Sequence, residues 1–515
     1  MVWKLLMLVV FFAVMLGVGL YCRRHATDVN GFVLGGRSVG PWLTAFAYGT
    51  SYFSAVIFIG YAGQFGWKFG VASTWIGIGN ALIGSLLAWV ILGRRTRLMS
   101  QHLDTSTMPE FFGKRFQSRS LKIGASVIVF VFLIPYTASL YNGLSRLFGM
   151  AFDIDYSVCV IVMAVLTGIY VIAGGYMATA INDFIQGIIM LGGIVAVIAA
   201  VLNSHGGFMA SLAELANVSD AAAGEVPGVF ASFFGPDPFG LLSVVILTSL
   251  GTWGLPQMVQ KFYAIKSEKS INKGTIISTL FALIVAGGCY FLGGFGRISG
   301  VAVGENGMPV GGYDAVVPAM LEKLPDVLIG VVVILVLSAS MSTLSSLVLA
   351  SSSTLTIDFL KDNIVKHMSE KKQVFTMRVF VVVFIAISAV IAIVQYNSNV
   401  SFIAQLMGIS WGALAGAFLA PFLYGLYAKK ISKISVWVCF VFGAGIMTLN
   451  MLFRSSFPTV LQSPINCGAF AMLAGLVLVP LVSLFTPKPA AADVKAMFSC
   501  YDKDVVVHAK ESLGE

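Results

Sequence analysis

A stripe of hydroxyl side chains runs along one face of a strongly apolar segment. Ten of the nineteen residues in the stretch SMSTLSSLVLASSSTLTID are serine or threonine, and they follow the apolar run VLIGVVVILVLSA. Residues three and four apart share a helix face. At this spacing the stripe consists of Ala339, Ser342, Thr343 and Ser346, with Ser345 beside it. Neutral hydroxyl and carbonyl oxygens suit one desolvated Na⁺, which is a hard cation. Small hydroxyl residues also pack helices closely, and the stripe alone leaves that alternative open.

One acid lies inside an apolar run. Asp183, in GGYMATAINDFIQGIIMLGG, is the one Asp or Glu within a predicted span that has no terminus beside it, whereas Asp358 lies at the end of a span. Acids inside a membrane are costly and usually functional. A second Na⁺ could use Ser342, Ser345 and Ser346, with Asp183 as the counter-charge. Proton relay through this lone acid is the alternative form of coupling.

Apolar helices must position these groups. The chain has 515 residues, of which 58% are hydrophobic and 11% charged, whereas soluble domains carry about 25% charged residues. Recurrent apolar runs of this length predict transmembrane helices, since barrel strands are much shorter. We predict an all-α polytopic membrane protein with about thirteen transmembrane spans, at 3–22, 41–65, 71–93, 123–148, 156–174, 178–202, 239–257, 274–296, 327–357, 379–396, 401–427, 435–453 and 467–486.

Basic residues set the predicted orientation. With the N-terminus outside and the C-terminus cytoplasmic, 26 of the 32 Lys and Arg residues, Lys261 among them, fall in cytoplasmic segments. This excess follows the positive-inside rule, so the net charge of +9 needs no nucleic acid partner. Arg23 and Arg24 follow the first apolar run without an A-x-A-like cleavage site, which indicates a retained helix. We expect the protein in the cell membrane.

Two predicted spans are interrupted in their interior. The second, PWLTAFAYGTSYFSAVIFIGYAGQFG, contains Gly49, and the seventh, LLSVVILTSLGTWGLPQMVQKF, contains Gly251, Gly254 and Pro256. These spans lie five apart, so they occupy matching places in two five-helix blocks of opposite orientation. Paired broken helices in such an inverted repeat, as in the LeuT type of transporter, point to a substrate site at the membrane midplane. Unwinding over residues 49–53 would free backbone carbonyls as ion ligands. Close packing is the alternative role of these glycines.

Catalytic groups are missing from the predicted spans. All five histidines lie outside them, and the spans contain neither a carboxylate pair nor an HExxH motif, so we do not expect an enzyme. The six cysteines are scattered, which indicates neither a disulfide framework nor a metal site. A solute-sensing membrane protein is a further alternative, although the tail from residue 487 is short for an output domain.

The chain resembles the sodium:solute symporter family in four segments. They are GGRSVGPWLTAFAYGTSYFSA, TMPEFFGKRF, GGYMATAINDFIQG and MSTLSS, and the similarity runs from about residue 30 to 430. The resemblance implies a LeuT-type core of ten helices in two inverted repeats, with one helix before it and two after. The implied organisation is a first helix and linker (1–40), a first repeat (41–202), an extracellular loop (203–238), a second repeat (239–430), two peripheral helices (431–486) and a cytoplasmic tail (487–515).

The resemblance also implies sodium ligands. The main site of the family would correspond to the carbonyl groups of Thr50, Phe53 and Ala339 and the hydroxyls of Ser342 and Thr343. Members with a second sodium would hold it at the residues matching Asp183, Ser342, Ser345 and Ser346. We therefore expect one Na⁺, or two.

The solute pocket departs from the patterns of known relatives. Proline symporters have an aspartate, a tryptophan and a tyrosine where this chain has Tyr52, Val56 and Thr252. Sugar carriers have a glutamine where this chain has Ile57, and sialic-acid carriers use an arginine that the stretch FVFLIPYTAS lacks. We expect no buried Lys or Arg in the pocket. The expected lining is Tyr52, Ser54, Tyr136, Tyr141, Asn142, Thr252, Trp253, Gln257, Gln405 and Trp411.

This lining favours a small, partly apolar solute such as an amino acid or a small monocarboxylate. A sugar, sialic acid or vitamin is the alternative. The leading hypothesis is therefore sodium-coupled uptake of a small organic solute by alternating access, carried out by a monomer. Sodium would tie the second span to the ninth.

Overall fold

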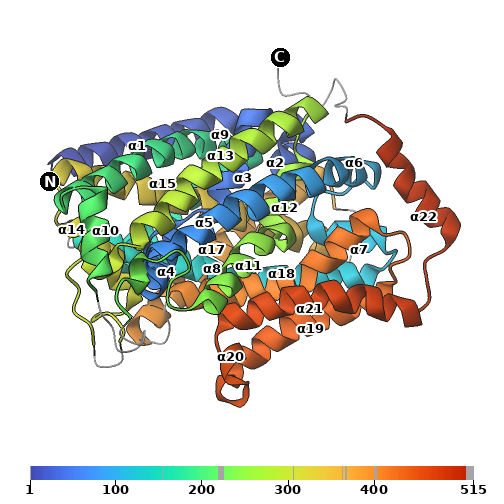
Figure 1. The fold of residues 1–515 in the computed structure, drawn as a ribbon. Helices are drawn as coiled ribbons and strands as arrows, with labels where there is room; N and C mark the ends of the chain where they lie inside the picture. The colour runs from blue at the N-terminus through green and yellow to red at the C-terminus, as the bar shows by residue number, and fades with distance from the viewer. Residues whose placement is uncertain are drawn as a thin grey trace.

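The structure, a computed structural model, describes residues 2–152, 155–218, 226–304, 307–361, 364–365, 368–398 and 403–505. Within these ranges the regular structure is helical, and two isolated bridges pair Val39 with Ile265 and Val303 with Pro309. The prediction of an all-α membrane protein is confirmed. Figure 1 shows most of the long helices lying side by side.

The chain up to Leu255, which interrupts the second of the two broken spans, contains α-helices and π-helical segments. The α-helices of the first part are α1 (Val2–Cys22), α2 (Val29–Leu34), α3 (Pro41–Tyr52), α4 (Ala62–Phe69), α5 (Thr74–Gly79), α6 (Arg94–His102), α7 (Met108–Arg115), α8 (Arg119–Phe152), α9 (Tyr156–Ser204), α10 (Phe208–Ala216) and α11 (Pro238–Gly254). Three π-helical segments continue them: η3 (Val56–Tyr61), η5 (Asn80–Leu87) and η6 (Trp89–Gly93).

The remaining helices follow Leu255, and α12 is the first of them. They are α12 (Pro256–Tyr263), α13 (Glu268–Gly293), α14 (Val316–Glu322), α15 (Asp326–Ser353), its π-helical continuation η11 (Thr354–Leu360), α17 (Glu370–Ser398), α18 (Ile403–Tyr427), α19 (Lys433–Leu452), α20 (Thr459–Gln462), α21 (Pro464–Phe485) and α22 (Ala491–Phe498).

The predicted spans coincide with helical segments. In the described part of the chain, ten helices are long and apolar enough to cross a membrane, and the bent pair α11–α12 makes an eleventh. Two of the ten are 47 and 49 residues long, more than one crossing needs. A glycine with positive φ interrupts each, Gly70 (φ 62°) in the first and Gly175 (φ 55°) in α9. The two predicted spans at 156–174 and 178–202 meet at Gly175.

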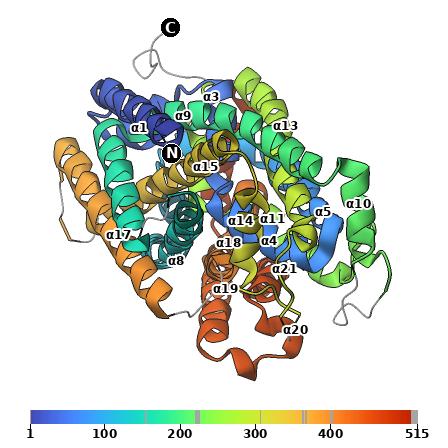
Figure 2. The same cartoon turned by 90° about the vertical axis from the view of Figure 1, so that its left-hand side faces the viewer.

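Burial separates the core helices from the periphery. The most apolar window of α18 is 94% buried and that of α15 is 78% buried, against 28% for α1. In the end-on view of Figure 2, α15 lies inside the bundle and α1, α17 and α19 lie at its edge. α15 packs against α3, α8 and α9, while α19 and α21 pack on α18. The hydroxyl stripe is therefore on one of the most enclosed helices.

Glycine brings two of the core helices into backbone contact. A Cβ atom on Gly66 of α4 would lie 1.8 Å from the carbonyl oxygen of Gly293 at the end of α13, a distance that no side chain can occupy. Only glycine allows so close an approach. The half-helix that follows the first break is thereby fixed against α13.

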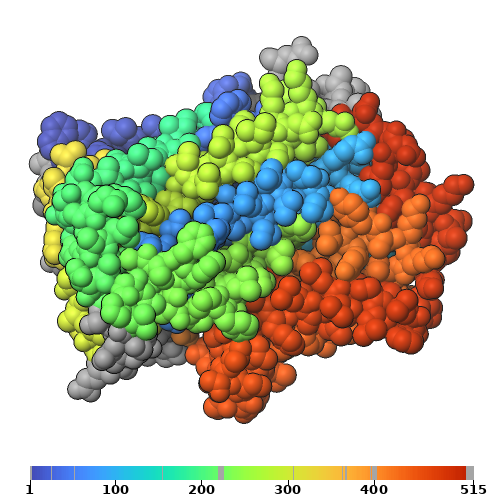
Figure 3. Space-filling view, viewed as in Figure 1, coloured from blue at the N-terminus to red at the C-terminus, as the bar shows by residue number. Residues whose placement is uncertain are grey.

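The C-terminal segment folds back over one end of the bundle, which we call the basic end because α6 and α7 contribute a group of arginine residues to it. The guanidinium of Arg95 lies between the rings of Tyr427 and Tyr501, 4.0 and 4.5 Å from their centroids. Arg94 donates to the carbonyl oxygens of Tyr501 and Lys503. Figure 3 shows this C-terminal segment, in red, packed against the neighbouring helices at one end of the molecule.

Candidate functional site

Both predicted broken spans are broken in the structure. Phe53 follows α3 in an extended conformation (φ −84°, ψ 120°), and Leu255 separates α11 from α12 (φ −85°, ψ 123°), with a bend of 47° between those two helices. Pro256 explains the second break, because a proline disfavours the helical conformation in the residue before it. The first break lies later than predicted, since Gly49 to Tyr52 remain helical in α3.

Serine hydroxyl oxygens accept hydrogen bonds from backbone amides that the first break leaves without a helical partner. The amide of Ala55 donates to Oγ of Ser340 on α15, at 3.1 Å. The amide of Val56 donates to Oγ of Ser54, at 3.2 Å. Side-chain oxygens satisfy helix N-termini in the same way elsewhere. The break can therefore sit at Phe53 rather than at a glycine, because α15 and Ser54 supply the missing acceptors.

The five groups of the first predicted ion site lie together. Oγ1 of Thr343 is 3.1 Å from the carbonyl oxygens of Thr50, Phe53 and Ala339. Oγ of Ser342 is 3.0 Å from the carbonyl oxygens of Thr50 and Ala339. All five residues are buried. The α3 segment and α15 thus turn five neutral oxygens toward one point.

This arrangement fits a small hard cation. Such ions take oxygen ligands, and in transporters unwound backbone supplies part of the shell. The hydroxyls come from α15, and two of the carbonyls come from the last residues before the first break. An ion held here would bridge α3 and α15.

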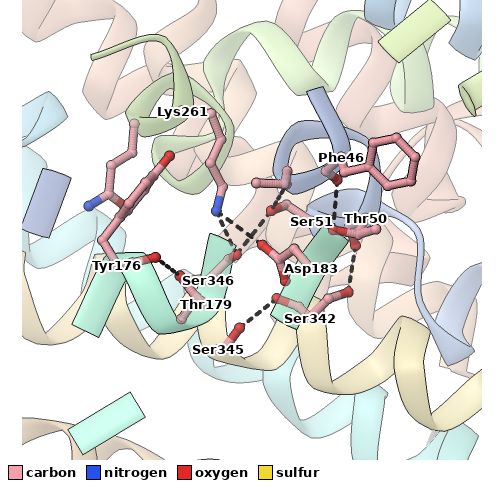
Figure 4. A network of polar contacts seen from close by, with 12 residues as sticks. Phe46, Thr50, Ser51, Tyr176, Thr179, Asp183, Lys261, Ser342, Ser345 and Ser346 are labelled. Carbon is pink, nitrogen blue, oxygen red and sulfur yellow. Dashed lines mark hydrogen bonds and ion pairs between the residues drawn. The ribbon is translucent and has the colours of Figure 1, made fainter. Parts of the chain in front are cut away.

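The second predicted set contains a cation that the sequence had placed elsewhere. Nζ of Lys261 lies 3.0 Å from Oγ of Ser346 and 3.7 Å from Oδ2 of Asp183 (Figure 4). Oγ of Ser346 is also 2.9 Å from Oγ of Ser51. We expected Lys261 outside the spans, in a cytoplasmic segment. That expectation is wrong, because Lys261 lies on α12, the second half of the broken span, and is 1% exposed.

The other members of the second set differ in their contacts. The hydroxyl of Ser345 donates to the carbonyl oxygen of Ser342 on its own helix, at 2.9 Å. Ser342 belongs to the first set through its contact with Thr50. Asp183 and Ser346 are the two members that contact Lys261 directly.

Some predicted solute residues gather beside the second break. The rings of Tyr136 on α8 and Trp411 on α18 meet edge to face, 5.9 Å apart and inclined by 85°. A Cβ atom on Gly251 would lie 2.8 Å from the Trp411 ring, so this aromatic pair lies against α11 just before its break. Gln257, just after the break, is buried, and neither polar atom of its amide has a hydrogen-bond partner among the described residues.

Other predicted solute residues bond to the protein itself. The hydroxyl of Thr252 donates to the carbonyl oxygens of Ser249 and Gly84, and the indole of Trp253 donates to that of Ile83. The amide oxygen of Asn142 accepts from Tyr156, and the amide oxygen of Gln405 accepts from Arg454. Tyr141 is buried, and its hydroxyl has no hydrogen-bond partner in the described part of the chain. Tyr52 is the last residue of α3, and its side chain lies outside the described residues.

Sequence reasoning missed three contributors. Ser51 and Ser340 provide hydroxyls at the junction of α3 and α15, and the ring of Tyr176 lies under Nζ of Lys261, 5.1 Å away. Ser340 was visible as a hydroxyl in the same apolar run. The position of Lys261 was not, because a lysine near a span end usually extends to the water interface.

The chain is similar to known transporters over nearly its whole length. The profile of the sodium:solute symporter family matches residues 32–443. The osmoregulated proline transporter OpuE of Bacillus subtilis (strain 168) is 28% identical over 499 residues, covering 96% of this chain and 97% of that protein. A sodium/proline symporter of Staphylococcus aureus (strain JH9) is 29% identical over 515 residues, covering 94% and 93%.

A solved structure has the same fold. The substrate-bound, outward-open state of a Na⁺-coupled sialic acid symporter superposes with a TM-score of 0.72 at 18% identity, covering 95% of this chain and 99% of that one. This likeness supports the LeuT-type architecture independently of sequence. With a family profile that spans most of its length, the chain belongs to the sodium:solute symporter family.

Proposed function

We propose that this protein is a sodium-coupled symporter that imports a small organic solute by alternating access. The single observation that carries the proposal is the position of Thr343, whose hydroxyl lies 3.1 Å from the carbonyl oxygens of Thr50 and Phe53 at the first break. Sodium bound there stabilises the arrangement in which α3 and α15 are in contact. Coupling between ion and solute is reciprocal, and typically amounts to 1–3 kcal/mol.

The favoured solute is an amino acid or a small monocarboxylate. Its carboxylate would meet the N-terminus of α12, where helix dipoles favour anions and the amide of Gln257 lies buried without a partner. The aromatic pair Tyr136 and Trp411 would cover its apolar part. The relatives that transport proline support an amino acid, whereas Tyr52, Val56 and Thr252 depart from the proline pattern.

The proposed orientation has the N-terminus outside and the basic end in the cytoplasm of a cell whose plasma membrane contains the protein as a monomer. The arginines of α6 and α7 at this end support it, since basic residues concentrate on the cytoplasmic side. Solute and Na⁺ would then leave near α7 and α12.

The test is thermal unfolding of purified protein with amino acids, monocarboxylates, sugars and vitamins, each in Na⁺ and in K⁺. A ligand at 100 times its dissociation constant stabilises by about 2.7 kcal/mol. We expect one class of solute to raise the unfolding temperature in Na⁺ only. Shifts that do not depend on the cation would contradict sodium coupling and favour proton coupling through Asp183.

A further inference from the structure

A buried ammonium group occupies the centre of the second predicted ion site. Figure 4 shows Nζ of Lys261 directed toward Asp183 and Ser346, with Ser51 beside Ser346. The distances are 3.0 Å to Oγ of Ser346 and 3.7 Å to Oδ2 of Asp183. The ring of Tyr176 presents its face to the same ammonium at 5.1 Å. These groups come from α12, α9, α15 and α3, so the cluster lies where the two repeats meet.

The cluster holds one negative charge, and Lys261 already compensates it. Asp183 and Lys261 are 0% and 1% exposed. Neither carboxylate oxygen of Asp183 accepts a hydrogen bond from the described residues, so the ammonium is the group that balances its charge. Ser51, Ser346 and the Tyr176 ring are neutral. A sodium ion added here would leave one uncompensated positive charge in a buried site, which is costly.

The ammonium also uses the ligands that the ion would need. Oγ of Ser346 accepts a hydrogen bond from Nζ of Lys261 and shares a second one with Oγ of Ser51. The hydroxyl of Ser345 donates to the carbonyl oxygen of Ser342. The first site is different, because none of the described residues places a cationic side chain within hydrogen-bond distance of its five oxygens, which lie between α3 and α15. One site is therefore available to sodium, and the other holds a covalently attached cation.

We infer that Lys261 is the resident cation of the second site, so that the protein binds and moves one Na⁺ per solute. This inference rests on the proposed function, because it concerns the stoichiometry of that symport. Lys261 belongs to the half-helix that begins at the second break, so its ammonium links this half-helix to α9 and α15 without an ion from solution. In this chain the residue at position 261 determines the number of coupling ions.

The experiment measures how many sodium ions bind and are transported. Purified protein is titrated with radioactive sodium at equilibrium. The same protein in proteoliposomes gives the Na⁺-to-solute ratio from the Na⁺ gradient that, at zero membrane voltage, balances a fixed solute gradient so that net solute flux is zero. The wild type should show one Na⁺ in both assays. Two would overturn the inference.

Variants test the role of Lys261 itself. Lys261→Met removes the ammonium and leaves Asp183 free, so both assays should rise from one Na⁺ to two; an unchanged value would contradict the inference. The charge-neutral double variant Lys261→Met/Asp183→Asn should return to one, and two would count against the charge argument. If Lys261→Met alone does not fold, the double variant, which buries no unpaired charge, still provides a test: one Na⁺ is expected, and two would contradict the inference. Lys269→Met, at an exposed position on α13, is the matched control and should keep one Na⁺.

Failure of the proposed function would give a different result. In that case the wild type would bind no sodium and its uptake would be indifferent to the cation, whereas failure of this inference alone gives sodium-dependent uptake with two ions.

Discussion

Phe53 and Leu255 have nearly the same backbone conformation, with φ of −84° and −85° and ψ of 120° and 123°. Each residue follows the first half of a broken helix, α3 or α11, and we predict that the two helices occupy matching positions in two inverted repeats. Different sequences produce this match: Pro256 enforces one break, while hydroxyl acceptors hold the other. The two breaks are therefore expected to respond differently to mutation.

Replacing Pro256 by alanine should weaken the second break. The substitution restores a backbone N–H and permits a helical conformation at Leu255. A straighter α11–α12 would move Gln257 and Lys261 away from their neighbours. We expect protein that folds and inserts but takes up solute about tenfold more slowly, equivalent to ~1.4 kcal/mol. Uptake in proteoliposomes measures this, and Pro464→Ala at the start of α21 is the control. Uptake at the wild-type rate would show that the bend does not depend on Pro256.

Replacing Thr343 by valine should specifically weaken sodium activation. Valine keeps the shape of threonine and removes the hydroxyl that contacts three carbonyl oxygens. Loss of one interaction with a charged partner costs about 1.5–3 kcal/mol, so half-activation should need about 10 to 100 times more Na⁺. The assay is uptake as a function of Na⁺ concentration. Ser352→Ala is the control, since within the described residues that hydroxyl donates to the Leu349 carbonyl oxygen of its own helix. An unchanged sodium requirement would remove Thr343 from the ion site.

Replacing Gln257 by leucine should separate stability from transport. A buried amide without partners costs about 1–3 kcal/mol, so leucine should raise the thermal stability of the protein without solute. If the amide contacts the solute, the same variant should show a KM raised about tenfold or more. Gln260→Leu is the comparison, because that amide already donates to the Val33 carbonyl and its loss should destabilise. A stabilised Gln257 variant with normal KM would exclude the amide from the solute site.

Asp314 should make stability depend on pH. It lies in the segment Tyr313–Ala315 before α14, outside the predicted spans, and its carboxylate accepts from the amide of Ile403 at the start of α18. Burial raises the pKa of Asp314 to about 6 from 3.8. The folded protein therefore favours the protonated form, and stability from this group is present below about pH 4 and is lost as pH rises to about 6, by about 3 kcal/mol.

The variant Asp314→Asn isolates this effect. Asparagine keeps an acceptor for the Ile403 amide and does not ionise, so the variant should be more stable than the wild type at pH 7 and equal to it near pH 4. Unfolding temperatures measured between pH 4 and pH 8 give the comparison. Parallel curves for the two proteins would show that Asp314 does not titrate in this range.

Local pattern was sufficient for much of the fold and for the α15 half of the proposed first ion site. Apolar runs located the helices, and the spacing of Ser342 and Thr343 on a helix gave their common face. The contact of that face with Thr50 and Phe53 followed from the family resemblance, since no local rule relates residues about 290 positions apart.

The hydrogen-bond and ion-pair partners of long polar side chains could not be predicted where several distant partners were possible. Gln405 appeared available for solute, but Arg454 lies close enough to bond it. From the sequence, Lys261 could reach either water or Asp183; in the structure its Nζ lies 3.7 Å from Oδ2 of Asp183. Such choices depend on tertiary geometry, which differs between chains with the same pattern of apolar and polar residues.

The two hydroxyls of the first site have fewer protons to donate than they have neighbouring carbonyl oxygens. Ser342 and Thr343 carry one hydroxyl proton each, yet they make five oxygen–oxygen contacts of 3.0–3.1 Å with the carbonyls of Thr50, Phe53 and Ala339. Without a cation, some lone pairs must face each other across the junction of α3 and α15, and their repulsion favours separation of the two helices. A Na⁺ held among these oxygens would attract all five of them and offset that repulsion. In the proposed symporter, a bound Na⁺ would therefore offset the repulsion between the oxygens of α3 and α15, and its release would favour separation of the two helices.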